Sequence, residues 1–255
     1  MVALTTLTLG ACGGGGGPSP KAAPATTAAA GTAPAPTAAP TTTAPPVVNV
    51  GATAKVARHD IFASPVQPEP VKTLDNPQPD GAAPGFTLPL RMLVVEDNGD
   101  WLKVLLPIRP NGSSGWIHRS DVDLEPRTDY RIVVELGAHQ ITVSKGDEVV
   151  LQEPVGVGES GRTPTTQGRF FTLELYKVLP KEQAVYGPYA FSLSGYSEVH
   201  YSFGGGTGVL GIHGTSDPSG LGHDVSNGCI RMSNSGITKL AETLPPWGVP
   251  VEIKA

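Results

Sequence analysis

One cysteine and one histidine near the C-terminal end of the chain have the types and spacing that nucleophilic catalysis needs. Cys229 follows Asn227 and Gly228, and His213 lies 16 residues earlier. A cysteine attacks as its thiolate, so it needs a nearby base or a positive field, and an imidazole can supply the base. The intervening segment is rich in Gly and Pro, which lets it fold back. Spacing alone leaves open that both residues are structural.

The residues around this pair favour a rigid site. His213 ends an apolar run, residues 209–212, which predicts a buried strand, and Gly214 follows directly. Gly228 permits a tight turn before Cys229. The backbone amides of the turn could then converge on a developing oxyanion.

Strand signals dominate residues 128–255. Seven runs alternate or stay apolar: 130–136, 140–144, 148–157, 169–179, 189–193, 209–213 and 249–254. One helix is predicted near the C-terminus, where Ile237, Leu240 and Leu244 recur at helical spacing. Candidate N-caps precede it and two prolines follow it. The sequence therefore predicts a mostly β domain with one short C-terminal helix.

Residues 47–127 predict a second, smaller β domain. Short alternating runs at 52–57, 90–96, 101–106 and 115–118 are separated by turn signals, of which Asn98-Gly99 is the strongest. The pattern Trp-Leu-Lys-Val at 101–104 and Gly-Trp-Ile at 115–117 resembles a bacterial SH3-like β-barrel. Such a module would bind cell-wall components or serve as a structural spacer.

The N-terminal residues resemble an export signal with a lipid anchor. Residues 1–12 are mostly apolar or hydroxylic and end in Leu-Gly-Ala-Cys, which resembles a lipoprotein signal lipidated at Cys12, although no basic stretch precedes it. We expect residues 1–12 to be only part of that signal. Residues 13–46, a Gly run followed by Ala, Pro and Thr, predict a disordered linker, because such a segment buries too little surface to fold.

Bulk composition excludes some functions. The net charge is −5 and charged residues make up 16% of the chain, so nucleic acid is not the expected partner. No apolar run is long enough to span a membrane. We expect no cofactor and no metal. A Cys/His set of His213, His223 and Cys229 is the rival zinc arrangement, although no carboxylate base accompanies it.

Two segments around the pair carry a family resemblance, namely Ile-His-Gly-Thr at 212–215 and Ser-Asn-Gly-Cys-Ile-Arg-Met at 226–232. They resemble the catalytic signature of L,D-transpeptidases of YkuD type. Thr-Pro-Thr-Thr-Gln-Gly at 163–168 resembles a further loop of that family. The likeness covers about half the chain. It implies a β-rich catalytic domain that acts on peptidoglycan stem peptides outside the cytoplasm and forms 3–3 crosslinks through a cysteine thioester.

The resemblance also implies roles for individual residues. Cys229 would be the nucleophile and His213, followed by Gly214, the general acid/base. Ser226, Asn227 and Gly228 would shape the oxyanion turn, and Arg231 would steady the loop or a substrate carboxylate. An ordinary surface ion pair is the plainer explanation of Arg231. Many family members have His where this chain has Asn227, so no second histidine can act there.

Three questions stay open at this stage. Water could resolve the thioester, which would make the protein an L,D-carboxypeptidase. The chain could instead be a non-catalytic wall-binding lipoprotein. Four further side chains could line the site or only pack within strands: Tyr186, Tyr196, His200 and Tyr201.

Overall fold

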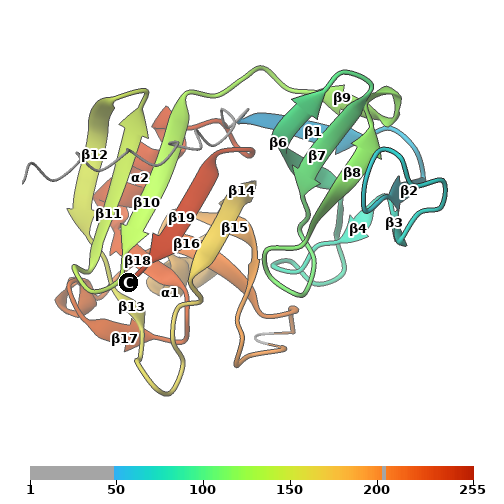
Figure 1. The fold of residues 1–255 in the computed structure, drawn as a ribbon. Coiled ribbons are helices and arrows are strands. Elements are labelled where there is room, and N and C mark those ends of the chain that lie inside the picture. Colours follow the sequence, from blue (N-terminus) through green and yellow to red (C-terminus); the bar gives the residue numbers. More distant parts are fainter. Residues whose placement is uncertain (1–48, 203–204) are drawn as a thin grey trace, which may run out of the picture. The chain divides into compact units, whose positions relative to one another are not determined.

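The computed structural model describes residues 49–202 and 205–255 (Figure 1). The fold is mostly β, as predicted. The predicted lipidation site Cys12, the signal and the linker at 13–46 lie outside the described residues. Within the described part of the chain, no helix is both long and apolar enough to cross a membrane.

The N-terminal part is built on a five-stranded antiparallel sheet. Its order is β8-β7-β6-β1-β9, with bounds β1 (Val50–Ala54), β6 (Arg91–Asn98), β7 (Trp101–Leu105), β8 (Ser114–His118) and β9 (Val122–Leu124). Gly99, with φ 68°, turns β6 into β7, as the Asn-Gly pair predicted. Side chains from alternate positions form a separate core that includes Met92, Leu102 and Ile117.

Smaller elements complete this part. Two-stranded sheets pair β2 (Arg58–Ile61) with β3 (Lys72–Asp75) and β4 (Gln78–Pro79) with β5 (Thr87–Leu88), and η1 is a 3-10 turn at Arg119–Asp121. Residues 80–86 connect β4 to β5. The SH3-like type of this part remains a prediction.

The C-terminal part is built on an eight-stranded mixed sheet of order β12-β11-β10-β19-β14-β15-β16-β18. Its strands are β10 (Tyr130–Glu135), β11 (Gln140–Lys145), β12 (Glu148–Pro154), β14 (Gly168–Lys177), β15 (Tyr189–Tyr196), β16 (Val209–Thr215), β18 (Ile230–Ser233) and β19 (Pro250–Lys254). Each predicted run in this part overlaps one of these strands, and β18 lies outside the predicted runs. Short β13 (Val157–Gly158) and β17 (Asp224–Ser226) pair with each other, and the 3-10 turns are η2 (Pro180–Glu182) and η3 (Pro218–Gly220).

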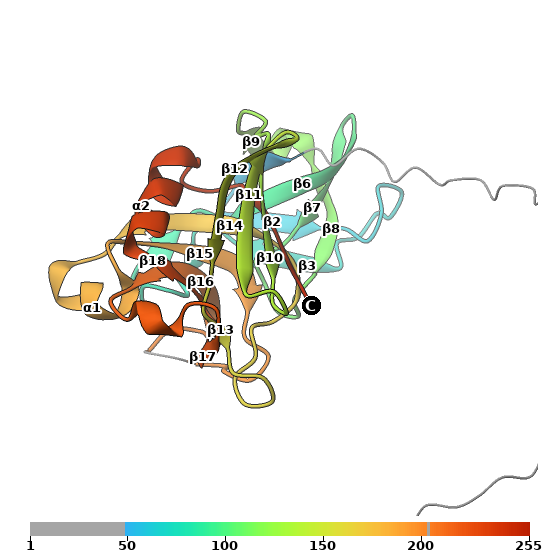
Figure 2. The ribbon, with the colours of Figure 1, turned by 90° about the vertical axis from the view of Figure 1, so that its left-hand side faces the viewer.

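The predicted C-terminal helix is α2 (Asn234–Thr243), which packs against β15, β16 and β18 (Figure 2). Ser233 caps it by accepting from the Gly236 amide, and Leu244 with the two following prolines ends it. Ile237 and Leu240 enter the main core. The expectation of one helix was incomplete. A second, four-residue helix, α1 (Gln183–Tyr186), lies between β14 and β15, and it is too short to show helical periodicity.

A small apolar cluster joins the two sheets. Leu93 and Leu105 from the N-terminal part pack on Phe171 of β14, with Val95 and Leu173 beside them. Phe171 is fully buried there. The face of β14 that points away from the main core is therefore partly covered by the N-terminal part.

Candidate active site

The register of β16 and β18 brings the predicted pair to one face of the sheet. These parallel strands place His213 beside Arg231 and Ile212 beside Ile230. Because side chains alternate, the two isoleucines enter the main core, and His213 and Arg231 point to the opposite face. Cys229 stands two residues before Arg231 at the start of the strand, so its side chain points to the same face.

A glycine leaves room for the sulfur of Cys229. Cys229 is a free, partly exposed cysteine. A Cβ at Gly211 would lie 3.8 Å from its Sγ. Gly211 precedes His213 by two residues on β16 and so shares its face. The thiol and the imidazole are therefore neighbours on one side of the sheet.

The imidazole of His213 is buried and oriented by a backbone carbonyl. The residue is 4% exposed, and its Nδ1 lies 2.7 Å from the carbonyl oxygen of Gly214. A carbonyl only accepts hydrogen bonds, so Nδ1 carries the proton and Nε2 carries the lone pair. The Tyr186 ring packs edge-on against this imidazole, with centroids 5.1 Å apart and planes at 75°. Nε2 is thus the atom that can accept a proton.

Close backbone contact positions the segment that carries Tyr186. Gly187 ends α1 with φ 64°, and a Cβ there would lie 2.6 Å from the Cα of Gly214. The Asn234 side chain fills the remaining space beside both glycines. The hydroxyl of Ser216 also donates to the Ala184 carbonyl. Only glycine fits at this contact, which holds α1 against β16.

Burial decides the protonation state of the pair. It raises the pKa of the Cys229 thiol, against smaller lowering effects from a Gly211 backbone hydrogen bond and the Arg231 charge. It lowers the pKa of His213 to about 4; the bond to Gly214 opposes this shift and Arg231 adds to it. At neutral pH the pair is therefore a thiol and a neutral imidazole. The expected thiolate is not the resting form, so it must arise by proton transfer.

Arg231 supplies a positive field at the site. It affects the pKa of both His213 and Cys229. No ion pair formed by Arg231 occurs among residues 49–202 and 205–255. The surface ion pair that the sequence left open is therefore not formed by the residues described.

The turn before Cys229 is held by Ser226. This buried hydroxyl donates to the Cys229 carbonyl at 2.6 Å and accepts from the Gly228 amide at 3.1 Å. Gly228 has φ 114°, a conformation that favours glycine. Thr163 donates from its hydroxyl to the Ser226 carbonyl at 2.8 Å, which ties the 163–168 loop to the turn. Because the Gly228 amide is already bonded, it is not an open donor for an oxyanion.

Comparisons with known proteins agree with this geometry. Residues 129–253 match the family model for the YkuD L,D-transpeptidase catalytic domain. The chain is 33% identical over 116 residues to the YkuD protein of Bacillus subtilis (strain 168), and 35% identical over 116 residues to that of Bacillus licheniformis, both named as L,D-transpeptidases. This chain carries a YkuD-family L,D-transpeptidase catalytic domain. The match covers 46% of this chain and 61% of the length of each relative.

Solved structures with this name are also similar to the chain. An L,D-transpeptidase from Mycobacterium tuberculosis H37Rv shows 14% identity and a TM-score of 0.42, covering 80% of this chain and 81% of that one. The LdtMt1 L,D-transpeptidase, solved in complex with imipenem, shows 20% identity and a TM-score of 0.39, covering 60% and 67%. At these TM-scores the structures carry no conclusion about this chain.

Within the L,D-transpeptidase domain, most of the predicted site residues come together. Six of them lie in β16, β17, β18 or the turn between β17 and β18: Cys229, His213, Gly214, Ser226, Gly228 and Arg231. The side chain of Asn227 is exposed. Only its backbone amide remains a candidate for the oxyanion turn.

Other predicted residues lie elsewhere in or beside the L,D-transpeptidase domain. His223 is exposed, and the rival set with His213 and Cys229 does not assemble: no group of three or more His, Cys, Asp and Glu side chains in the described segments could hold a metal ion. The hydroxyl of Tyr196 donates to the Pro107 carbonyl at 2.8 Å, and the Tyr201 ring packs on Arg109. These two tyrosines therefore contact the N-terminal part.

Sequence reasoning did not assign a role to Gly211 or to Gly187. A glycine inside a strand, directly opposite the candidate nucleophile, signals close approach of another group. That signal depends on knowing which strands pair. Tyr186 was only one of four open possibilities, and the structure places its ring on His213.

Proposed function

We propose that this chain is a peptidoglycan L,D-transpeptidase that forms 3–3 crosslinks between stem peptides through a thioester on Cys229. The observation that carries the proposal is the arrangement of one free thiol and one carbonyl-oriented imidazole on the same face of β16 and β18. The family match limits the reaction to the L,D-transpeptidase class. The stem peptide as substrate and the crosslink as product are the proposed parts.

The first half of the reaction acylates Cys229. Nε2 of His213 takes the proton from the thiol as Sγ attacks the carbonyl carbon between the third residue and the terminal D-Ala of a tetrapeptide stem. The resulting oxyanion would be met by the backbone amides of Asn227 and Cys229. Nε2 then returns its proton to the amine of D-Ala, which leaves, and the thioester remains.

The second half transfers the acyl group. The side-chain amine of a neighbouring stem attacks the thioester carbonyl, and Nε2 of His213 takes the amine proton. The sulfur of Cys229 leaves as thiolate and regains that proton. Two neutral resting groups suit this cycle, because the imidazole starts as a base in both halves.

Arg231 and Ser226 would support the two half-reactions. The Arg231 charge favours the thiolate as it forms and is placed to attract the carboxylate of a stem peptide. Ser226 keeps the turn in shape through its two hydrogen bonds. Arg231 therefore acts on the sulfur of Cys229, and Ser226 acts on the backbone of the turn, at the Gly228 amide and the Cys229 carbonyl.

We also propose an extracytoplasmic location at the cell wall. A lipid anchor on Cys12 and the linker at 13–46 would hold the folded part away from the membrane. The N-terminal part, residues 47–127, would be an SH3-like module. The anchor and the linker rest on the sequence alone, since residues 1–48 are not described.

Incubation with a disaccharide-tetrapeptide and mass analysis of the products tests the reaction. A crosslinked dimer with loss of D-Ala supports transpeptidation, whereas tripeptide monomer alone indicates carboxypeptidase activity. Cys229→Ala should abolish both products and the covalent adduct of the enzyme. Cys12→Ala, the same change at the chain's other cysteine, is the matched control and should retain activity. Crosslinking by Cys229→Ala would rule the mechanism out.

A further inference from the structure

A row of paired residues runs across the eight-stranded sheet from β14 to the candidate active site. Tyr176 on β14 pairs with Ala190 on β15, Ala190 pairs with His213 on β16, and His213 pairs with Arg231 on β18. Directly opposite residues in neighbouring strands share a face. Tyr176 therefore projects from the same face as the imidazole.

A second row runs parallel to the first, two residues away along each strand. Glu174 pairs with Ser192, and Ser192 pairs with Gly211, which lies beside Cys229. Small residues thus occupy β15 in both rows, at Ala190 and Ser192, and β16 in the second row, at Gly211. Two strand spacings, about 10 Å, separate β14 from β16. An extended peptide that reaches Cys229 across this face would meet Tyr176 and the groups bound to it.

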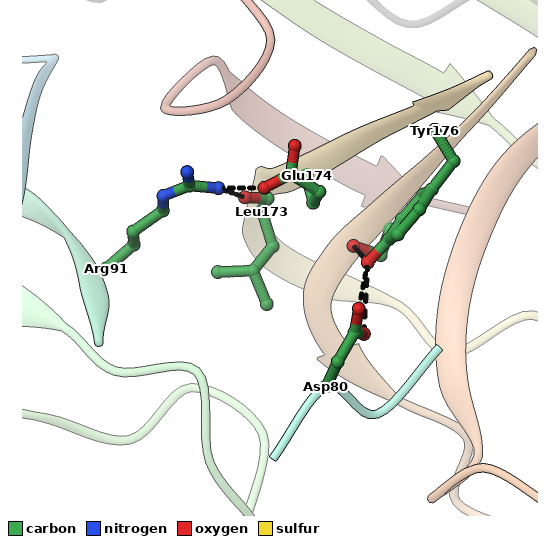
Figure 3. Close-up of polar contacts among 6 residues, drawn as sticks. Asp80, Arg91, Leu173, Glu174 and Tyr176 are labelled. Carbon is green, nitrogen blue, oxygen red and sulfur yellow. Dashed lines mark hydrogen bonds and ion pairs between the residues drawn. The ribbon is translucent and has the colours of Figure 1, made fainter. Parts of the chain in front are cut away.

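The N-terminal part supplies a carboxylate to this face. Asp80, which is 7% exposed, accepts from the Tyr176 hydroxyl at 3.0 Å to each of its oxygens, as Figure 3 shows. It also accepts from the amides of Ala82 and Ala83 at 2.9 and 3.1 Å. Burial raises the pKa of Tyr176 and the Asp80 charge adds to this, so the phenol remains a neutral donor. Its oxygen also lies 3.5 Å from the Ser192 hydroxyl.

The loop that carries Asp80 borders the strand of the imidazole. The Gly81 carbonyl accepts from the Thr207 amide at 3.1 Å, and a Cβ at Gly81 would lie 3.1 Å from the side chain of Val209. Val209 begins β16, two residues before Gly211. A second contact from the N-terminal part reaches β14, where Arg91 donates to the Leu173 carbonyl and pairs with Glu174 (Figure 3). At Gly81 the loop therefore contacts the start of β16, two residues before Gly211.

We propose that Asp80 and Tyr176, one from each part of the chain, form a specificity-determining wall against which the stem peptide lies when it is bound at Cys229. The inference rests on the proposed function. It makes the N-terminal part a component of the substrate site, in addition to any role in the cell wall. Asp80 keeps the phenol and the 80–84 loop in place, and the peptide contacts that wall while its scissile carbonyl reaches the sulfur.

Steady-state kinetics on the full chain test the wall with a matched control. Tyr176→Phe removes the hydroxyl that meets Asp80, and Asp80→Asn removes the charge. The control is Tyr196→Phe, which removes a hydroxyl from a tyrosine of β15. That hydroxyl also bonds to the N-terminal part, at the Pro107 carbonyl, but Tyr196 lies outside both rows. We expect the first two variants to raise KM for the disaccharide-tetrapeptide by roughly three- to tenfold, as the loss of one hydrogen bond allows. The control should keep the wild-type KM.

The rate of alkylation by a small thiol reagent distinguishes loss of the substrate wall from a general loss of Cys229 reactivity. In a Cys12→Ser background, iodoacetamide should alkylate Cys229 at the same rate in wild type, Tyr176→Phe and Asp80→Asn, because it is too small to need the wall. Ala190→Leu, which fills the first row between Tyr176 and His213, should raise KM at least as much and covers the case in which Asp80→Asn does not fold. Equal KM values for Tyr176→Phe and Tyr196→Phe would overturn the inference, as would alkylation rates that fall in step with kcat/KM. Absence of turnover by the wild type would instead refute the proposed function.

Discussion

The buried imidazole of His213 should make the folded chain lose stability as the pH falls. Burial holds its pKa at about 4, whereas the same group in the unfolded chain titrates near 6.5. Between these values the unfolded state binds the proton and the folded state does not. The contribution of His213 is therefore fully present above about pH 6.5 and is lost as the pH falls towards 4. A difference of about 2.5 between the two pKa values corresponds to about 3 kcal/mol.

Comparison of wild type with His213→Gln isolates this effect. Urea unfolding followed by tryptophan fluorescence would be measured at about pH 7 and about pH 4.5. We expect the wild type to lose about 2–3 kcal/mol more than the variant over this interval. His59, whose pKa burial also lowers, contributes in the same direction, but it is present in both proteins and cancels.

Two results would refute this reasoning. One is an equal loss of stability in the two proteins. The other is an NMR titration of the His213 ring whose midpoint lies near the ordinary pKa of histidine. Burial would then not lower the pKa of this imidazole. Either result would also remove the argument that His213 begins each half-reaction as a neutral base.

Four further changes test the site and its supports. The acid limb of kcat/KM should lie well below pH 6.5, because the pKa of His213 is lowered to about 4; a limb at 6.5 would contradict this. Gly187→Ala places a Cβ 2.6 Å from the backbone of β16 at φ 64°, so it should cost roughly 2–4 kcal/mol in chemical denaturation and reduce kcat. Ser226→Ala should cost about 1–3 kcal/mol and slow acylation of Cys229; an unchanged acylation rate would remove Ser226 from the mechanism. Ser233→Ala, at the N-cap of α2, should cost about 1 kcal/mol and leave kcat unchanged.

Local features of this chain were readable from the sequence. The strand runs from 130–136 to 249–254, the Asn98-Gly99 turn and the capped helix after Ser233 all depend on interactions within a few residues. The two side chains suited to nucleophilic and acid/base chemistry, Cys229 and His213, could also be identified from the sequence. The signature around them indicated the family that the comparisons support. Such signals need no knowledge of distant segments.

The tertiary structure decided which of these segments meet. Cross-strand register set Gly211 beside Cys229 and Tyr176 in the row of His213, and register depends on packing between segments far apart in the chain. Burial, which no local pattern reports, made the resting pair a thiol and a neutral imidazole. The hydrogen bond from the Gly228 amide to Ser226 removed one expected oxyanion donor. The sequence determined which groups are present, and the pairing of β14, β15, β16 and β18 determined their neighbours and their charge.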